Sequence, residues 1–142
     1  MGAATVLMAS GEELPENVKV IIADCGYTSE WDEFKCEANA LHIPWFPVLN
    51  AASVLSRLRD GYDFKQASAL EKVKQSRIPT LFIHGSDDEL VPYSMLDKLY
   101  SAAACEKECL TVNGAGHALS SSVEPELYWN TVESFIDKYL EK

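Results

Sequence analysis

Short apolar, β-branched runs alternate with helix-like segments along this chain of 142 residues. The runs lie at 18–23, 80–83 and 108–112. Such alternation is typical of parallel strands joined by right-handed helical crossovers. Parallel strands are buried on both faces, so we expect helices on both sides of the sheet and at least one long strand edge without a partner. The predicted fold class is therefore α/β, a three-layer αβα arrangement with about three parallel strands.

Four segments carry helical patterns. Residues 2–10 are alanine-rich and apolar almost all round until Gly11, which predicts a buried helix. Residues 65–76 predict a second helix, and Pro92 suits the first turn of a third that ends near residue 104. A last helix opens at Pro125. Its apolar residues recur at helical spacing, namely Val132, Phe135, Ile136, Tyr139 and Leu140.

Residues 30–62 interrupt the alternation. The segment is rich in large apolar residues, and Pro44 and Pro47 break any single periodic pattern. Because loops longer than about 15 residues in compact domains tend to be functional, we expect a lid or cap here. The alternative is a plain helical excursion packed on the core. Trp45 and Phe46 would either line an acyl pocket or form the core of the cap.

Two residues suited to catalysis each follow a predicted strand directly. Asp88 lies in the sequence His-Gly-Ser-Asp-Asp-Glu-Leu-Val-Pro at 84–92, and His117 lies in Gly-Ala-Gly-His-Ala at 114–118. Reactive groups of open parallel sheets gather at the carboxyl ends of the strands. Acyl transfer by serine needs a histidine to take the hydroxyl proton and a carboxylate to orient that histidine. The two residues therefore predict an acid and a base at one sheet edge.

Other residues compete for these roles. Asp88 would also serve as a cap for the turn into the next helix, and Asp87 is a neighbouring acid that suits the turn itself. Asp24 also follows a strand, so it is the alternative acid. His84 closes a strand and is expected to be packed and hydrogen-bonded rather than a second base. His42 lies in the insert and is given no role.

The two motifs, acid first and histidine second, resemble the C-terminal half of bacterial α/β-hydrolases of the esterase and prolyl-oligopeptidase-like kind. The acid motif of that family is His-Gly, two variable residues, Asp, two variable residues and Val-Pro, which places Asp88 as the acid. Its Gly-x-Gly-His motif places His117 as the base. The resemblance covers nearly the whole chain. It implies a serine hydrolase that cleaves carboxylic esters or related acyl substrates with a Ser-Asp-His triad.

The beginning of the chain departs from the pattern of this family. Met1 and Gly2 resemble the last two residues of the Gly-x-Ser-x-Gly elbow, so the serine would precede Met1 and the Met1 N–H would serve the oxyanion hole. Neither Ser10 nor the serines at 120–122 have the elbow spacing after a strand, so we expect no substitute. The chain is then a partial domain that lacks its nucleophile and is inactive alone. Its expected segments are 1–29 (helix and strand after the elbow), 30–62 (lid or cap) and 63–142 (acid and histidine strands with the final helices).

The net charge and the cysteines limit which partners and cofactors the sequence predicts. With 22 acidic and 12 basic residues the net charge is −10, which argues against nucleic acid and against an anionic membrane surface. No apolar run approaches the roughly 20 residues of a membrane span. The cysteines form no Cys-x-x-Cys pair, so we expect no metal and no cofactor, and free thiols indicate a reducing, cytoplasmic setting. These cysteines are Cys25, Cys36, Cys105 and Cys109.

Besides the hypothesis of a hydrolase that acts on a small ester or acyl substrate, the sequence leaves two further hypotheses open. Without a nucleophile, the chain would be a non-catalytic α/β module that binds a partner or a small ligand. The strand at 18–23 would also have a bare edge, and exposed strand edges pair with other chains. We therefore expect self-association, through that edge or by exchange of the first helix.

Overall fold

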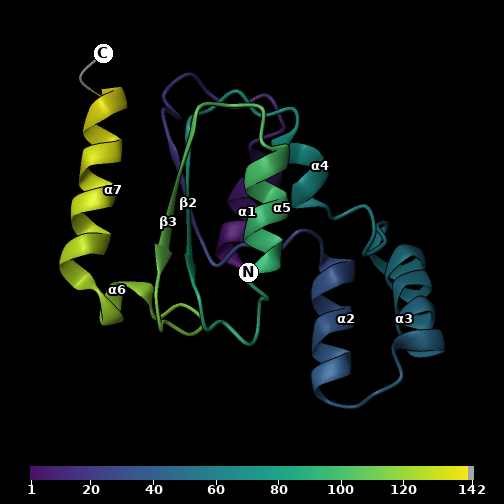
Figure 1. Cartoon of the computed structure of the whole chain (residues 1–142). Coiled ribbons are helices and arrows are strands. Elements are labelled where there is room, and N and C mark those ends of the chain that lie inside the picture. Colours follow the sequence, from purple (N-terminus) through teal and green to yellow (C-terminus); the bar gives the residue numbers. More distant parts are fainter. Residues whose placement is uncertain (141–142) are drawn as a thin grey trace.

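The computed structural model describes residues 1–140; residues 141 and 142, the end of the expected segment 63–142, lie outside this description. Strands and helices alternate after the first helix, apart from three consecutive helices in the middle of the chain and two at its end (Figure 1). In chain order the elements are α1 (Gly2–Ala9), β1 (Ile21–Asp24), α2 (Glu30–Ala40), α3 (Trp45–Asp60), α4 (Ala69–Val73), β2 (Thr80–Gly85), α5 (Ser94–Ala102), β3 (Lys107–Val112), α6 (Ser120–Val123) and α7 (Pro125–Leu140).

The strands form one parallel sheet in the order β1-β2-β3. Thr80 of the central strand lies opposite Ile21 on one side and Lys107 on the other, so all three strands run in register toward the same edge. Every residue of β2 is buried, as expected for a strand covered on both faces. The predicted α/β class with three parallel strands is confirmed.

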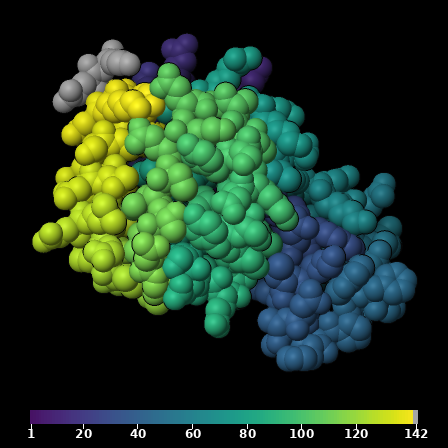
Figure 2. Space-filling view, viewed as in Figure 1, coloured from purple at the N-terminus to yellow at the C-terminus, as the bar shows by residue number. Residues whose placement is uncertain are grey.

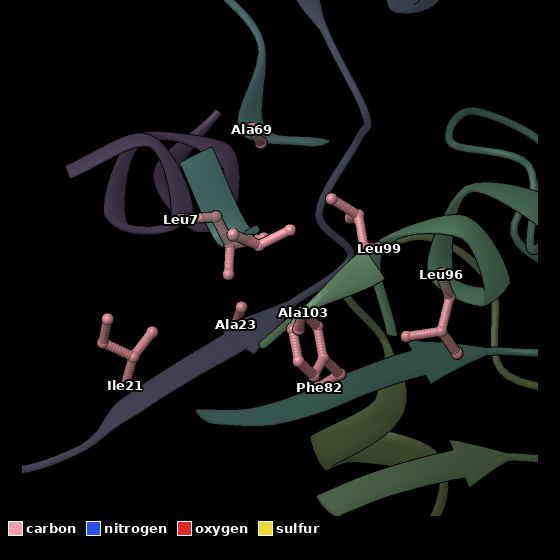
Figure 3. Close-up of a cluster of buried hydrophobic side chains, with 9 residues drawn as sticks. Leu7, Ile21, Ala23, Ala69, Phe82, Leu96, Leu99 and Ala103 are labelled. Carbon is pink, nitrogen blue, oxygen red and sulfur yellow. The ribbon is translucent and has the colours of Figure 1, made fainter. Parts of the chain in front are cut away.

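Helices cover both faces of the sheet (Figure 1). On one face α1, α4 and α5 pack against β1 and β2, and Figure 3 shows Leu7, Phe82 and Leu99 meeting in this core. On the other face α7 places Val132 and Phe135 against β2 and β3. The layers are therefore helix, sheet and helix, which confirms the three-layer arrangement.

Two predicted element boundaries need correction. The run at 18–23 forms a strand only over Ile21–Asp24, because hydrogen bonding to β2 begins at Ile21. The helix predicted over 65–76 is restricted to Ala69–Val73. The Asp63 carboxylate accepts hydrogen bonds from backbone N–H groups just after it and fixes a turn, and Ser68 then caps the helix by accepting from the Glu71 N–H. The start of the last helix at Pro125 is confirmed.

The insert predicted at 30–62 is a pair of helices, α2 and α3, that extends from the sheet layer as a separate lobe (Figures 1 and 2). Ser29 caps α2 by accepting from the Asp32 N–H. Backbone hydrogen bonds join the insert to residues just before α4, including Glu30 N–H to the Ala67 carbonyl and Trp31 N–H to the Phe64 carbonyl. Within residues 1–140, no helix has the length and apolar character needed to cross a membrane.

Candidate active site

The loops that follow β2 and β3 bring Asp88 and His117 into contact. Oδ2 of Asp88 and Nδ1 of His117 are 2.9 Å apart. The Asp88 carboxylate is completely buried, whereas the His117 ring remains one-third exposed. Within residues 1–140 the hydrogen bonds of this ring use Nδ1 alone, so Nε2 is open to a reactant. The arrangement has the geometry of a carboxylate that orients a general base.

Backbone groups hold the Asp88 carboxylate in its ionised form. Its Oδ1 accepts hydrogen bonds from the N–H groups of Leu90 at 3.0 Å and Val91 at 2.9 Å. Burial is the largest single influence and would raise the pKa of Asp88. The Val91 N–H, the His117 hydrogen bond and the positive charge of His117 together outweigh it, so the pKa lies below its usual value.

A glycine at the end of β2 lets the two loops approach each other. A Cβ atom built on Gly85 would lie 2.1 Å from the carbonyl oxygen of Ala115, which no real side chain tolerates. The same carbonyl accepts a hydrogen bond from the Asp87 N–H at 3.0 Å. Ser86 Oγ accepts another from the Gly114 N–H at 2.8 Å. The glycine of the His-Gly motif is therefore needed for the acid and histidine loops to meet.

Cys25 lies beside the pair, at the end of β1. Its Sγ accepts a hydrogen bond of 3.3 Å from the N–H of Ala118, the residue after His117. The sulfur, an Asp88 oxygen and a His117 nitrogen lie within 4.8 Å of one another, close enough in principle for a metal ion. Burial, however, raises the pKa of the Cys25 thiol to about 12. A thiol must lose its proton to ligate a metal, so these donors fit a hydrogen-bonded cluster better than a metal site.

His84 is buried below the site. Its Nε2 lies 2.9 Å from the Val91 carbonyl oxygen and 3.4 Å from Oδ2 of Asp88, and its ring packs edge-on against Tyr93. Both neighbours of Nε2 are acceptors, so that nitrogen carries a hydrogen. His84 thus supports the loop that carries Asp88 and has no access to solvent.

The alternative acid, Asp24, is not hydrogen-bonded to His117 among the bonds found in residues 1–140. Its Oδ1 instead accepts from the Cys25 thiol at 3.1 Å. Its negative charge also contributes, after burial, to raising the pKa of Tyr128 on α7 to about 12. Asp24 therefore faces the layer of α7, and of the two candidate acids only Asp88 touches the histidine.

A cavity of about 190 Å³ opens beside His117. Met1, the predicted oxyanion-hole residue, lines it, with its Sδ 3.3 Å from the Tyr27 hydroxyl. Three glutamates of α2 also line it and were not singled out from the sequence, although their spacing of three and four residues places them on one helix face. They are Glu30, Glu33 and Glu37.

The structure does not bring Trp45 and Phe46 to this cavity. Both lie at the start of α3, where Pro44 and Pro47 set the chain course, and Phe46 is 66% exposed. The ammonium group of Lys35 sits 4.7 Å from the centre of the Trp45 ring, on the far end of the insert. Neither residue therefore lines the cavity beside His117.

The parallel sheet covered by helices on both faces, with polar loops after its second and third strands, belongs to the α/β class. Solved structures show that this fold is that of the α/β-hydrolases, although their sequence identities are too low to show more than the fold. An acylaminoacyl peptidase of Pyrococcus horikoshii superposes with a TM-score of 0.71 at 15% identity, covering 99% of this chain and 23% of that one. An esterase of Pyrococcus furiosus gives 0.69 at 15% identity, covering 97% and 51%.

Sequence comparison leads to the family. The profile of the prolyl oligopeptidase family matches residues 1–142, and the chain belongs to this family within the α/β-hydrolase superfamily. YqkD of Bacillus subtilis is 30% identical over 138 residues, which are 96% of this chain and 45% of YqkD. Human alpha/beta hydrolase domain-containing protein 17C is 30% identical over 106 residues, 72% and 32% of the two chains. The chain thus spans less than half the length of these relatives.

Proposed function

We propose that this chain is the acid-and-base half of a serine hydrolase that acts on carboxylic esters or related acyl groups. The observation that carries the proposal is the 2.9 Å contact between Asp88 and His117 behind two parallel strands. Membership of a hydrolase family supports the same reaction class.

In the proposed reaction His117 Nε2 takes the proton of an attacking serine hydroxyl and later returns it to the leaving group. Asp88 accepts from Nδ1–H, which fixes the tautomer that leaves Nε2 unprotonated. It also stabilises the imidazolium as it forms. A depressed pKa suits this role because the carboxylate must keep its charge throughout.

The serine is proposed to come from residues that precede Met1 in a longer polypeptide. Met1 lines the cavity beside His117, where the residue after an elbow serine would present its N–H to the oxyanion. The chain would then be inactive alone, because it supplies the acid and the base but neither the serine nor the second oxyanion donor.

A fluorophosphonate probe tests the proposal. The chain would be compared with a form extended through the residues that its gene encodes before Met1. We expect labelling of the extended form only, abolished by His117→Ala and lowered by up to about 10⁴-fold in Asp88→Asn, since that change favours the wrong tautomer. Asp87→Asn, a change at the exposed neighbour, should label normally. No labelling of either form would refute the proposal and favour a non-catalytic module.

We also propose that the chain self-associates along β1. An apolar cavity of about 230 Å³ lies at this edge and is lined by Val18, Val20 and Ile22 among others. An unpaired edge with apolar neighbours is a template for pairing with a second chain. Sedimentation velocity at micromolar concentration should show dimers, and Val20→Lys should convert them to monomers. A monodisperse monomer of the unaltered chain would contradict the proposal.

A further inference from the structure

The outer helix of the insert, α3, presents an apolar face to solvent (Figure 1). This face carries Pro47, Ala51, Val54, Leu55 and Leu58, which recur at intervals of three and four residues and so lie along one side of the helix. The same residues line a shallow groove of about 490 Å³. Val54, Leu55 and Leu58 are all exposed. A continuous apolar face of this kind marks a surface that binds a partner.

The charges of the insert are segregated between its two helices. Residues 38–59 are the longest stretch of the chain without an acidic residue, and they include Arg57 and Arg59. The acids of the insert lie mainly on α2, where three of them line the cavity beside His117. In Figure 1, α2 stands between α3 and the sheet layer. The outward surface of the insert is therefore apolar and cationic, although the net charge of the chain is −10.

A cationic pocket adjoins the apolar groove. The pocket has a volume of about 150 Å³ and shares Asn50 and Val54 with the groove. Its cations are Arg57 and Lys65, and none of the ion pairs found within residues 1–140 includes either of them. The Lys65 ammonium group instead lies 4.4 Å from the centre of a tryptophan ring on α2. One acid, Asp63, also lines the pocket, and its Oδ1 already accepts two backbone N–H groups.

We propose that the insert docks on a membrane surface that contains anionic phospholipids. The helix α3 would lie parallel to the surface, with its groove among the outer carbons of the acyl chains and the cationic pocket at the headgroup phosphates. Trp45 and Phe46, at the start of α3, would lie at headgroup depth, where aromatic rings are favoured. An apolar groove continuous with unpaired cations matches an amphiphile with an anionic head. A second copy of the chain matches less well, because it would bring the same arginines to the contact.

The acidic remainder of the chain opposes this docking only weakly. At about 0.1 M salt, charges more than about 10 Å from the headgroups are largely screened. The acids behind α2 should therefore repel the surface less than Arg57 and Lys65 attract it. The docking goes beyond the proposed function and does not depend on it, because no residue of the groove or of the cationic pocket lines the cavity beside His117.

Cosedimentation of the chain with lipid vesicles at about 0.1 M salt tests the docking. One set of vesicles contains equal amounts of phosphatidylcholine and phosphatidylglycerol, and the other contains phosphatidylcholine alone. We expect at least about tenfold tighter binding to the anionic vesicles. Leu58→Asp should weaken that binding at least about tenfold, because it puts an acid in the apolar groove. Leu140→Asp, the same change at an exposed leucine of α7, should leave the binding nearly unaltered.

Two further pairs of variants locate the lipid on the molecule. Arg57→Gln should lower the preference for anionic vesicles roughly fivefold, whereas Arg77→Gln, at an exposed arginine outside the insert, should retain it. Vesicles with brominated acyl chains should quench the tryptophan fluorescence of the bound chain. The quenching should persist in Trp129→Phe, which removes an exposed ring of α7, and decrease in Trp45→Phe.

Equal binding to the two kinds of vesicle, or binding to neither, would overturn the proposal. Binding that survives Leu58→Asp, or quenching that is lost in Trp129→Phe alone, would place the lipid on another surface and overturn it as well. Absence of vesicle binding, together with oligomers that Leu58→Asp separates and Val20→Lys leaves intact, would assign the face to a second copy. None of these outcomes depends on fluorophosphonate labelling, so the docking and the hydrolase are refuted separately.

Discussion

The sheet layer and the α2–α3 insert use their apolar residues in opposite ways. Leu81 and Phe82 of β2 are at most 1% exposed, whereas Val54 and Leu58 of α3 are 59% and 81% exposed. The buried carboxylates of the two regions also differ in their hydrogen bonding. Asp88 at the end of the sheet has its carboxylate fully hydrogen-bonded, while Glu33 of the insert is buried with an oxygen unpaired.

The two regions are therefore under different constraints. The sheet layer buries the apolar residues of its central strand and pairs the Asp88 carboxylate, although His84 Nδ1 and Ser120 Oγ are buried there without a hydrogen-bond partner. The insert exposes large apolar side chains and also buries a carboxylate oxygen without a partner, and local packing alone explains neither feature. Elements that break such rules are commonly the ones that contact a ligand or a partner.

The largest difference is expected for truncation of large apolar side chains. Phe135→Ala removes a ring that is 1% exposed and should cost about 3–5 kcal/mol of unfolding free energy. Leu58→Ala removes a side chain that is already in solvent and should cost less than about 0.5 kcal/mol. Urea unfolding measures both. A large cost for Leu58→Ala would show that α3 is covered in solution, for example by a second copy.

The next largest difference in stability is expected between two glycine substitutions, one in each region. Gly85→Ala forces a Cβ to 2.1 Å from the Ala115 carbonyl oxygen, so we expect a loss of about 3 kcal/mol and separation of the two loops. Gly61→Ala in the insert meets no atom within 4 Å but must keep a φ of +82°, which costs about 1 kcal/mol. Urea unfolding ranks the two, and the Nδ1–H proton resonance of His117 reports on the site. That resonance persisting in Gly85→Ala would disprove the role of this glycine.

A stability gain is expected at Glu33. Its pKa is about 7 in the folded chain against about 4.5 in the unfolded one, so folding becomes less favourable as pH rises through this interval. Above pH 7 the penalty is complete and amounts to at most about 3 kcal/mol. Glu33→Gln should therefore stabilise the chain at pH 8 and not at pH 4. Chemical unfolding at both pH values measures this.

The matched change Glu89→Gln should leave stability nearly unaltered at either pH, because Glu89 is exposed. An equal gain for Glu33→Gln at pH 4 and pH 8 would mean that the folded chain does not penalise the charge of Glu33, which would contradict the raised pKa.

Much of the sheet layer was predictable because its signals are local. Apolar runs predicted the strands, and helical spacing predicted the start of the last helix at Pro125. The loops of Asp88 and His117 were placed at one sheet edge by parallel topology, and the contact between them is present. The start of β1 was shifted because it depends on pairing with β2, which is distant in sequence. The shorter helix at Ala69–Val73 follows from the local turn at Asp63 and the Ser68 cap, which the apolar spacing did not indicate.

The cavity was not predictable in the same way. Glu33 looks like any acid in the first turn of a helix, where negative charge is favourable. Its burial arises only when α2 packs beside the loops after β1 and β2, which are distant in sequence. Conversely, Trp45 and Phe46 look like pocket residues by composition, but the course of the insert carries them elsewhere.

The smallest effect is expected for a cysteine beside the site. Cys25→Ala removes the acceptor of the Ala118 N–H, and Ala118 is exposed enough for water to replace it. We expect a cost of about 1 kcal/mol and an unchanged Nδ1–H resonance of His117, because the Asp88 bond and the close approach at Gly85 still hold that loop. Cys36→Ala, at a half-buried cysteine of α2, should cost less than Cys25→Ala. Loss of the resonance in Cys25→Ala would mean that the thiol, rather than the carboxylate, positions the histidine, and the sheet layer would then depend on β1 for its site as well as for its core.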